Sequence, residues 1–146
     1  MRIIKVSLLL MIFSIASNFI ITNAAIVNGS GIIGGVDTIK VGKTVTSSAF
    51  KKELYVAQSI KNTNTYTTIT NPCNDCKIKS ELLYKKSDGK FGSLGSTYTY
   101  MNQKGIFANT TIASAPGTFK IKNSRNGITA VTTYFAYDWC IDNTCN

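Results

Sequence analysis

The chain has 146 residues, including 16 lysines and arginines, 7 aspartates and glutamates, 4 cysteines and no histidine. This length suits one domain, and the lack of histidine excludes a Ser-His-Asp triad. The net charge of +9 favours solubility or attraction to a polyanion of the cell envelope. Nucleic acid is not expected as a partner, because Arg125 is the only arginine after residue 24 that could read bases.

The first two dozen residues predict a secretory signal peptide. Arg2 and Lys5 form a cationic start, residues 6–21 are almost wholly apolar, and residues 22–25 offer small side chains for cleavage after Ala24. The apolar run is shorter than the ~20 residues that span a bilayer. We therefore expect residues 1–24 to be removed. The mature, secreted chain of residues 25–146 would carry 14 basic and 7 acidic residues, a net charge of +7, and no transmembrane segment.

Residues 25–40 contain four glycines, at positions 29, 31, 34 and 35, among isolated apolar residues. This composition predicts a flexible arm that precedes the folded domain. The domain itself is expected to span residues 41–146.

From residue 41 onward, β-forming residues dominate and turn signals recur at short intervals. We expect strands at 41–48, 53–61, 64–70, 76–86, 96–101, 105–113, 117–123 and 127–139. Such spacing is typical of a single antiparallel β-sandwich, immunoglobulin-like or jelly-roll-like, with no further helix.

Strict alternation over residues 118–122 predicts one strand face in the core and one in solvent. Lys120 and Lys122 belong to the solvent face. The last strand is apolar or threonine-rich on both faces, which favours a central position in its sheet. The predicted core residues of these two strands are Phe119, Ile121, Phe135, Tyr137 and Trp139.

The four cysteines, Cys73, Cys76, Cys140 and Cys145, predict two disulfides in an exported chain. A four-thiolate zinc site is the alternative, and an oxidising compartment disfavours it. A Cys73–Cys76 ring would be tight, and a bond that closes a loop of over sixty residues constrains the unfolded chain more strongly. We therefore expect two disulfides that join the first pair of cysteines to the second.

Few residues suit catalysis, and we expect no cofactor and no metal. Asp138 and Asp142 flank Trp139 and Cys140 and could form a carboxylate pair, as glycosidases use. The simpler interpretation is that both cap the end of a strand beside a disulfide.

Aromatic and basic side chains are the better candidates for binding. Exposed tyrosines stack on sugars or lie at membrane interfaces. The candidate surface residues are Tyr98, Tyr100, Tyr134, Lys120, Lys122 and Arg125. Asn28 and Asn109 begin glycosylation sequons, which matter only if the source glycosylates secreted proteins.

The C-terminal third resembles a known family. Residues 115–120 read APGTFK, residues 124–126 read SRN, and residues 134–139 read YFAYDW. This series, with Ala130 between its last two parts, resembles the end of the septum-inhibiting lactococcin bacteriocins. That resemblance implies a small exported β-sandwich and a non-enzymatic toxin that acts on cell-wall precursors.

The sequence thus favours a secreted, non-enzymatic antimicrobial or toxin-like protein that binds an anionic cell-envelope component. A binding or structural module of the cell surface or extracellular matrix is the alternative. A small hydrolase ranks last, because the chain lacks histidine and a sandwich of this size has little room for a deep cleft.

Overall fold

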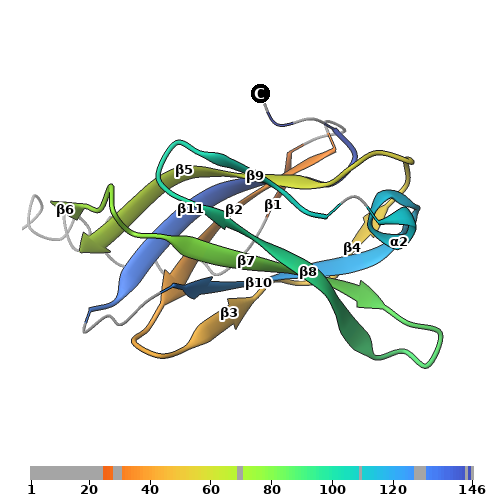
Figure 1. The fold of residues 1–146 in the computed structure, drawn as a ribbon, viewed down its shortest axis with the longest axis horizontal. Helices are drawn as coiled ribbons and strands as arrows, with labels where there is room; N and C mark the ends of the chain where they lie inside the picture. The colour runs from red at the N-terminus through yellow and green to blue at the C-terminus, as the bar shows by residue number, and fades with distance from the viewer. Residues whose placement is uncertain are drawn as a thin grey trace, which may run out of the picture.

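The computed structural model describes residues 25–27, 31–68, 71–108, 110–126, 131–143 and 145. Two antiparallel sheets pack face to face as a β-sandwich, which confirms the predicted fold class (Figure 1). The predicted signal peptide and both sequon asparagines, Asn28 and Asn109, lie outside the described residues.

The first sheet, here called sheet A, has its longest strands at its centre. Its order is β1 (Ala25–Val27), β2 (Ile32–Ile39), β11 (Thr133–Cys140), β5 (Ser59–Thr68) and β6 (Asn71–Pro72), and β9 (Lys104–Ile106) also pairs with β5. β11 lies between β2 and β5, so the prediction of a central last strand is confirmed. An extra residue on β5 shifts its register against Ala136 and Tyr137.

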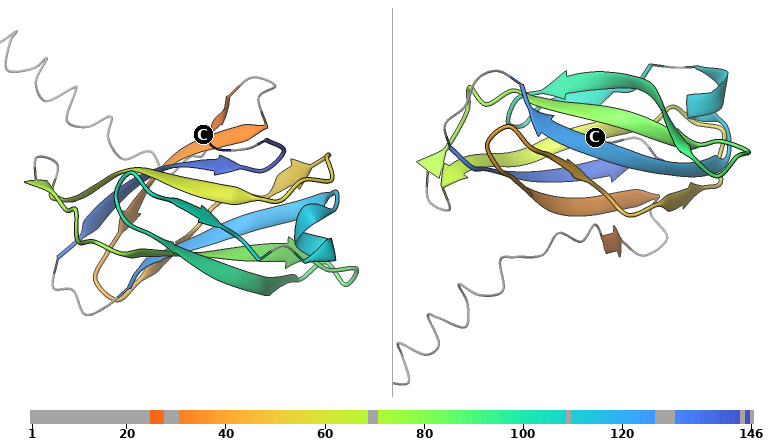
Figure 2. Two further views of the ribbon diagram at one scale, coloured as in Figure 1. Left: turned by 45° about the horizontal axis from the view of Figure 1, so that its top comes forward. Right: turned by 90° about the horizontal axis from the view of Figure 1, so that it is seen from below.

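The second sheet, sheet B, faces sheet A across the core, and Figure 2 shows the two layers from other sides. Its order is β3 (Thr44–Thr46), β10 (Gly117–Arg125), β7 (Ile78–Lys85) and β8 (Phe91–Thr99), and β4 (Phe50–Lys52) also pairs with β10. β3 and β4 pair with opposite ends of β10, so they share one edge of this sheet.

The aromatic core forms as the alternation predicts. Phe119, Ile121, Phe135, Tyr137 and Trp139 are all buried. Trp139 contacts Phe50 edge-on, with ring centroids 5.9 Å apart. Its indole N–H donates to the buried Gln58 side chain at 3.0 Å, and the Gln58 amide donates to the carbonyl of Ala113 at 2.8 Å.

Ala113 belongs to α2 (Thr111–Ser114), a single turn whose N-cap Thr110 accepts from the Ala113 N–H. We expected a strand at 105–113, and only β9 forms at its start. Within the described residues, no helix is long and apolar enough to cross a membrane.

The expectation of a flexible arm over residues 25–40 is wrong for the part that the structure describes. β2 pairs with β11 along eight residues and buries Ile33 and Ile39. The prediction was wrong because it took the glycines as the sign of a flexible segment. Gly35 lies opposite Tyr137, and a Cβ there would lie 2.5 Å from Tyr137 Cζ, so glycine at this position makes room for the ring.

Other strand bounds also differ from expectation. The two strands expected at 53–61 and 64–70 are one long strand, β5, because the extra residue in its middle lets pairing to β11 continue across it. β8 begins at Phe91, before the expected residue 96.

The expected cross-links between the cysteine pairs are wrong. Cys73 bonds to Cys76 and Cys140 to Cys145, with Cα–Cα distances of 5.3 and 5.6 Å. β5 separates the pairs, since Cys140 lies opposite Ser59 and Cys73 N–H donates to the Thr65 carbonyl. Six residues of strand span about 20 Å, so a disulfide cannot bridge the pairs.

Candidate functional site

Charge is distributed unevenly between the two sheets. The strands of sheet B carry seven basic residues and one acidic residue, and those of sheet A carry two of each. The net charges are therefore +6 and 0, and they become +5 and +1 when Lys52 and Asp37, which are buried, are left out. Because the sheets form opposite faces of the sandwich (Figure 1), the described strands give the molecule one strongly cationic side and one side with little net charge.

The cationic side has a group of lysines on β7 and β10 and immediately before β7, which we call the lysine face: Lys77, Lys79, Lys120 and Lys122. They alternate with buried residues such as Ile78 and Ile121, so they point away from the core. Lys122 forms an ion pair with Glu81 on the neighbouring strand. The hydrogen bonds that Glu81 accepts from Lys122 and Ser93 hold its pKa below the usual value.

Aromatic rings contact two of these four lysines. The Lys77 ammonium lies 4.9 Å from the Tyr98 ring centroid and 5.8 Å from that of Tyr100. Lys120 lies 4.5 Å from the Phe91 centroid. These cation–π contacts and the ion pair hold Lys120 and Lys122 half-buried on the outer face, so they are less exposed than expected.

The structure brings together only some of the predicted surface residues. Tyr98, Tyr100, Lys120 and Lys122 lie on the outside of sheet B, where Lys77 and Phe91 join them unforeseen. The alternation of Lys77 with the apolar Ile78 in the sequence could have placed Lys77 on this face. Tyr134 lies on the other sheet, half-buried opposite Tyr66. Arg125 ends β10 and donates to Thr133 Oγ1 at 3.1 Å, so it links the two sheets.

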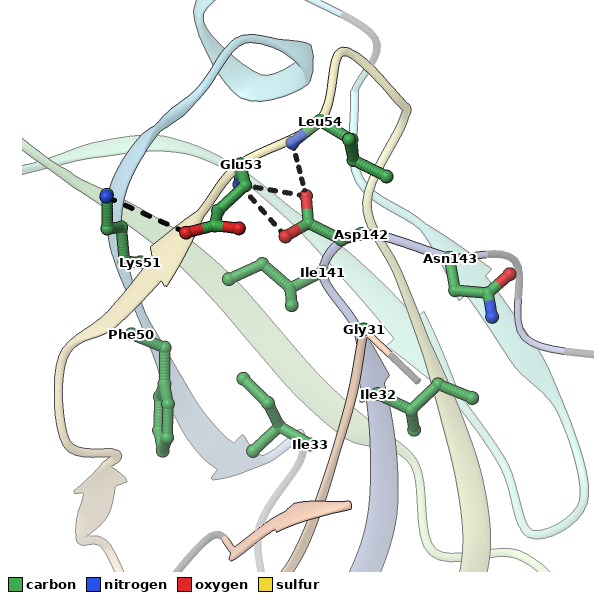
Figure 3. Close-up of a pocket in the computed structure, with 10 residues that line it drawn as sticks. All are labelled: Gly31, Ile32, Ile33, Phe50, Lys51, Glu53, Leu54, Ile141, Asp142 and Asn143. Carbon is green, nitrogen blue, oxygen red and sulfur yellow. Dashed lines mark hydrogen bonds and ion pairs between the residues drawn. The ribbon is translucent and has the colours of Figure 1, made fainter. Parts of the chain in front are cut away.

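A second feature is a pocket of about 680 Å³ where β2 begins, β4 ends and β11 is followed by a turn (Figure 3). Apolar side chains form much of its wall, including Ile32, Phe50 and Leu54. At its polar side the Asp142 carboxylate accepts from the backbone N–H groups of Glu53 and Leu54 at 2.8–3.1 Å.

Asp142 also contacts a buried lysine. Lys52 is fully buried, and its ammonium donates to the Ile141 carbonyl at 2.6 Å and to Asp142 Oδ1 at 3.1 Å. Burial raises the pKa of Asp142, but its hydrogen bonds from Leu54 and Glu53 and the Lys52 charge outweigh this and hold the pKa below its usual value. Sequence reasoning missed Lys52, because a lysine on a short strand is normally placed at the surface.

The carboxylate pair considered from the sequence does not form a catalytic arrangement. Asp142 is engaged by two backbone N–H groups and Lys52, as a capping residue would be, while Asp138 lies within β11 opposite Gly34 and Lys61. Among the described residues, no group of three cysteine, aspartate or glutamate side chains is placed to hold a metal ion.

A third feature is polar and lies inside the sandwich. Asp37 is 4% exposed and accepts from the Asn123 amide at 2.8 Å across the two sheets. Burial raises the pKa of Asp37, and the Asn123 hydrogen bond opposes this. Within the described part of the chain, four buried side-chain atoms lack a partner: Asn62 Nδ2, Ser80 Oγ, Thr99 Oγ1 and Asn123 Oδ1.

No model of a known protein family matches the sequence, and no curated protein matches it. Among solved structures, the chain is similar to the Yersinia pseudotuberculosis-derived mitogen, with 10% identity and a TM-score of 0.45 over 79% of this chain and 89% of that chain. It is also similar to the structures of infectious bursal disease virus strains Gx and Gt. Their identities are 14% and 12% and their TM-scores 0.37 and 0.36, over 83% and 81% of this chain. The match spans about a third of each viral chain. At these values no functional argument follows.

Proposed function

We propose that this protein is a secreted, non-enzymatic antimicrobial or toxin-like protein that binds an anionic component of the cell envelope through the lysine face. The observation that carries the proposal is the segregation of charge: leaving out the buried Lys52 and Asp37, the strands of sheet B carry a net charge of +5 and those of sheet A a net charge of +1. A charge excess gathered on one side creates a directional attraction to polyanions, whereas charge needed only for solubility has no reason to be one-sided.

The contacts on that face support binding. Aromatic rings under Lys77 and Lys120 fix where the ammonium groups lie, so less side-chain entropy is lost when an anion binds. The lysines on one strand are two residues apart, about 7 Å, which suits a partner with repeated negative groups. Both local disulfides support an extracellular location, where such bonds persist.

Phosphate is the anionic group that the envelope offers most widely, either in lipid headgroups or in wall polymers. The test therefore has two arms. Binding is measured to vesicles of phosphatidylglycerol with phosphatidylcholine, and separately to purified lipoteichoic acid, at low and high salt. We expect salt-sensitive binding in at least one arm, and the arm that binds identifies the source of the phosphate.

A matched pair of double variants locates the surface. Lys79→Gln with Lys120→Gln removes two charges from the lysine face, and Lys40→Gln with Lys61→Gln removes two from elsewhere. The first pair should weaken binding by about tenfold or more and the second should not, because a Lys contact near an anionic surface is worth about 1 kcal/mol. Equal losses, or no binding in either arm, would overturn the proposal. Growth inhibition of Gram-positive cells by wild type but not by the first variant tests the toxin assignment.

One observation favours the alternative, a structural module of the cell surface or matrix. β1 has the sequence AIV and forms one edge of sheet A. An apolar edge strand can pair with a second copy. Sedimentation over a range of protein concentrations distinguishes the two functions, since a matrix module polymerises and the proposed toxin stays monomeric.

A further inference from the structure

The outer face of sheet A differs from the lysine face because it carries few charged residues. Its three longest strands, β2, β11 and β5, carry only three charged residues: Asp37, Lys61 and Asp138. Asp37 points into the core, and Lys61 lies opposite Asp138 near one end. Toward the other end this face is neutral.

Two tyrosines lie side by side in this neutral region. Tyr134 on β11 is directly opposite Tyr66 on β5, and Thr38 on β2 completes the row. The next row is formed by Val36, Ala136 and Asn64. We call these six residues the tyrosine patch. Val36 is 43% exposed, and the other five are half-buried.

Hydrogen-bonding groups border the two rings. The Asn64 amide donates to the Tyr66 hydroxyl, while Asn64 Oδ1 accepts from the backbone N–H of Thr65. The Tyr66 hydroxyl therefore acts as an acceptor within the protein and retains its own proton to donate. The extra residue of β5 lies immediately before Asn64, and bulges re-aim side chains at functional sites.

Ala136 lies between Val36 and Asn64 in the second row. Three strands and two rows cover about 10 Å by 7 Å, which is the size of one or two sugar rings. A neutral surface of this kind, with two phenol rings, an amide and hydroxyls, matches a ligand that is uncharged, has flat apolar C–H faces and is rich in hydroxyls.

We propose that the tyrosine patch binds a neutral oligosaccharide. This goes beyond the proposed function, because it assigns a second surface on the opposite side of the molecule and does not depend on the lysine face. A protein partner fits less well, because Val36 is the only aliphatic side chain of the patch larger than alanine. A lipid surface fits less well because the patch has no cation to meet phosphate headgroups.

The test titrates the full mature chain with a panel of neutral hexasaccharides: cellohexaose, chitohexaose, mannohexaose, maltohexaose, xylohexaose and laminarihexaose. Backbone amide NMR shifts report the contact. We expect at least one of these sugars to shift the amides of β11 and β5 around Tyr134 and Tyr66, with an affinity that does not change between low and high salt.

Substitutions of the two tyrosines test whether the sugar binds at the tyrosine patch. Tyr66→Ala and Tyr134→Ala should each weaken binding by about tenfold, whereas Tyr134→Phe, which keeps the ring, should bind nearly as wild type. Tyr55→Ala is the matched control, since Tyr55 is 79% exposed and belongs to neither proposed binding surface, and it should change nothing.

The proposal is overturned if no sugar of the panel binds at millimolar concentration, or if binding survives both alanine variants while their spectra show the native fold. Vesicles of phosphatidylcholine form the last arm. Partition into them that depends on Tyr66 and Tyr134, without any sugar binding, would assign the patch to a membrane interface instead. Failure here leaves the test of the lysine face unaffected, because that test uses anionic probes and other residues.

Discussion

The ammonium group of Lys52 lies 3.1 Å from the carboxylate of Asp142, although 90 residues separate them in the chain. The contact joins the end of β4 to the turn that follows β11. Gly31 is also held there, because its carbonyl accepts from the N–H groups of Ile141 and Asp142. The ion pair and these two backbone hydrogen bonds together hold three distant segments at one end of the sandwich.

Lys52→Met should destabilise the fold. Methionine fills the space, but the Ile141 carbonyl and one side of Asp142 lose their partner, which should lower the free energy of unfolding by about 2–3 kcal/mol. Chemical denaturation measures this. Lys51→Met is the control, since the Lys51 side chain is 78% exposed, and should change stability by less than about 0.5 kcal/mol. Equal effects of the two substitutions would contradict a structural role for the buried lysine.

Asp142 should make stability fall in acid. Its folded pKa lies below the model-compound value of 3.8 that applies to the unfolded chain, so its contribution is fully present above that value and is lost as the pH falls through the folded pKa. Asp142→Asn should therefore be less stable than wild type at pH 7, and the difference should shrink below pH 3.8. Denaturation curves across this range measure both. A difference independent of pH would show that the carboxylate charge is not responsible.

Asp37 should behave in the opposite way. Burial raises its folded pKa above 3.8, so protonation favours the folded state, and stability is lost as the pH rises through the folded value. Asp37→Asn keeps an acceptor for the Asn123 amide and removes the buried charge. The variant should unfold at a higher denaturant concentration than wild type at pH 7, with the gap closing in acid. A variant less stable at pH 7 would mean that the carboxylate has a compensating partner.

Gly35→Ala should disrupt the contact with Tyr137. The added methyl group would lie 2.5 Å from Tyr137 Cζ and 2.6 Å from its hydroxyl oxygen, and overpacking of this kind lowers stability by about 1–3 kcal/mol. Pairing it with Tyr137→Leu in a double-mutant cycle isolates the clash. The alanine should be better tolerated in the Tyr137→Leu background, and additive effects would place the cause elsewhere.

A single tryptic digest tests the pairing of the four cysteines. Trypsin cleaves after Lys61, Lys77 and Arg125, so Cys73 and Cys76 share the peptide 62–77 while Cys140 and Cys145 share the peptide 126–146. Local bonds leave these two peptides separate under non-reducing conditions, each about 2 Da lighter than its reduced form. A joined species would contradict the structure. Since both loops are short, loss of either bond should lower stability by about 2 kcal/mol or less on the entropic model.

Local patterns predicted what depends on neighbours in the chain. The alternation around Phe119 and Ile121 identified a strand and its buried face, and the apolar run through Trp139 identified a central strand. Contacts between residues far apart in the chain could not be predicted from local patterns. Gly35 lies in a strand that pairs with β11 beside the Tyr137 ring, and the buried Lys52 is paired with Asp142 and the Ile141 carbonyl.

The two candidate surfaces show the same difference between local patterns and long-range contacts. Alternation placed Lys120 and Lys122 on one face, but the tyrosine patch requires Tyr66 and Tyr134, 68 positions apart, to become register partners. Which cysteines meet likewise depends on how far apart β5 holds the two pairs, and that separation is set by the fold rather than by the spacing of the cysteines.

The pairing of β2 with β11 has a consequence for how the chain acquires its structure. Sheet A joins a strand near the beginning of the described chain to one near its end, with β11 at the centre. In a polypeptide that emerges N-terminus first, from a ribosome or a translocation channel, β2 can pair only with β1 until roughly a hundred more residues have appeared. The long-range pairing of β2 with β11 cannot start earlier. Completion of the core is thereby deferred until β11 has been released. A polypeptide that has to pass a narrow channel in an extended state gains from that delay.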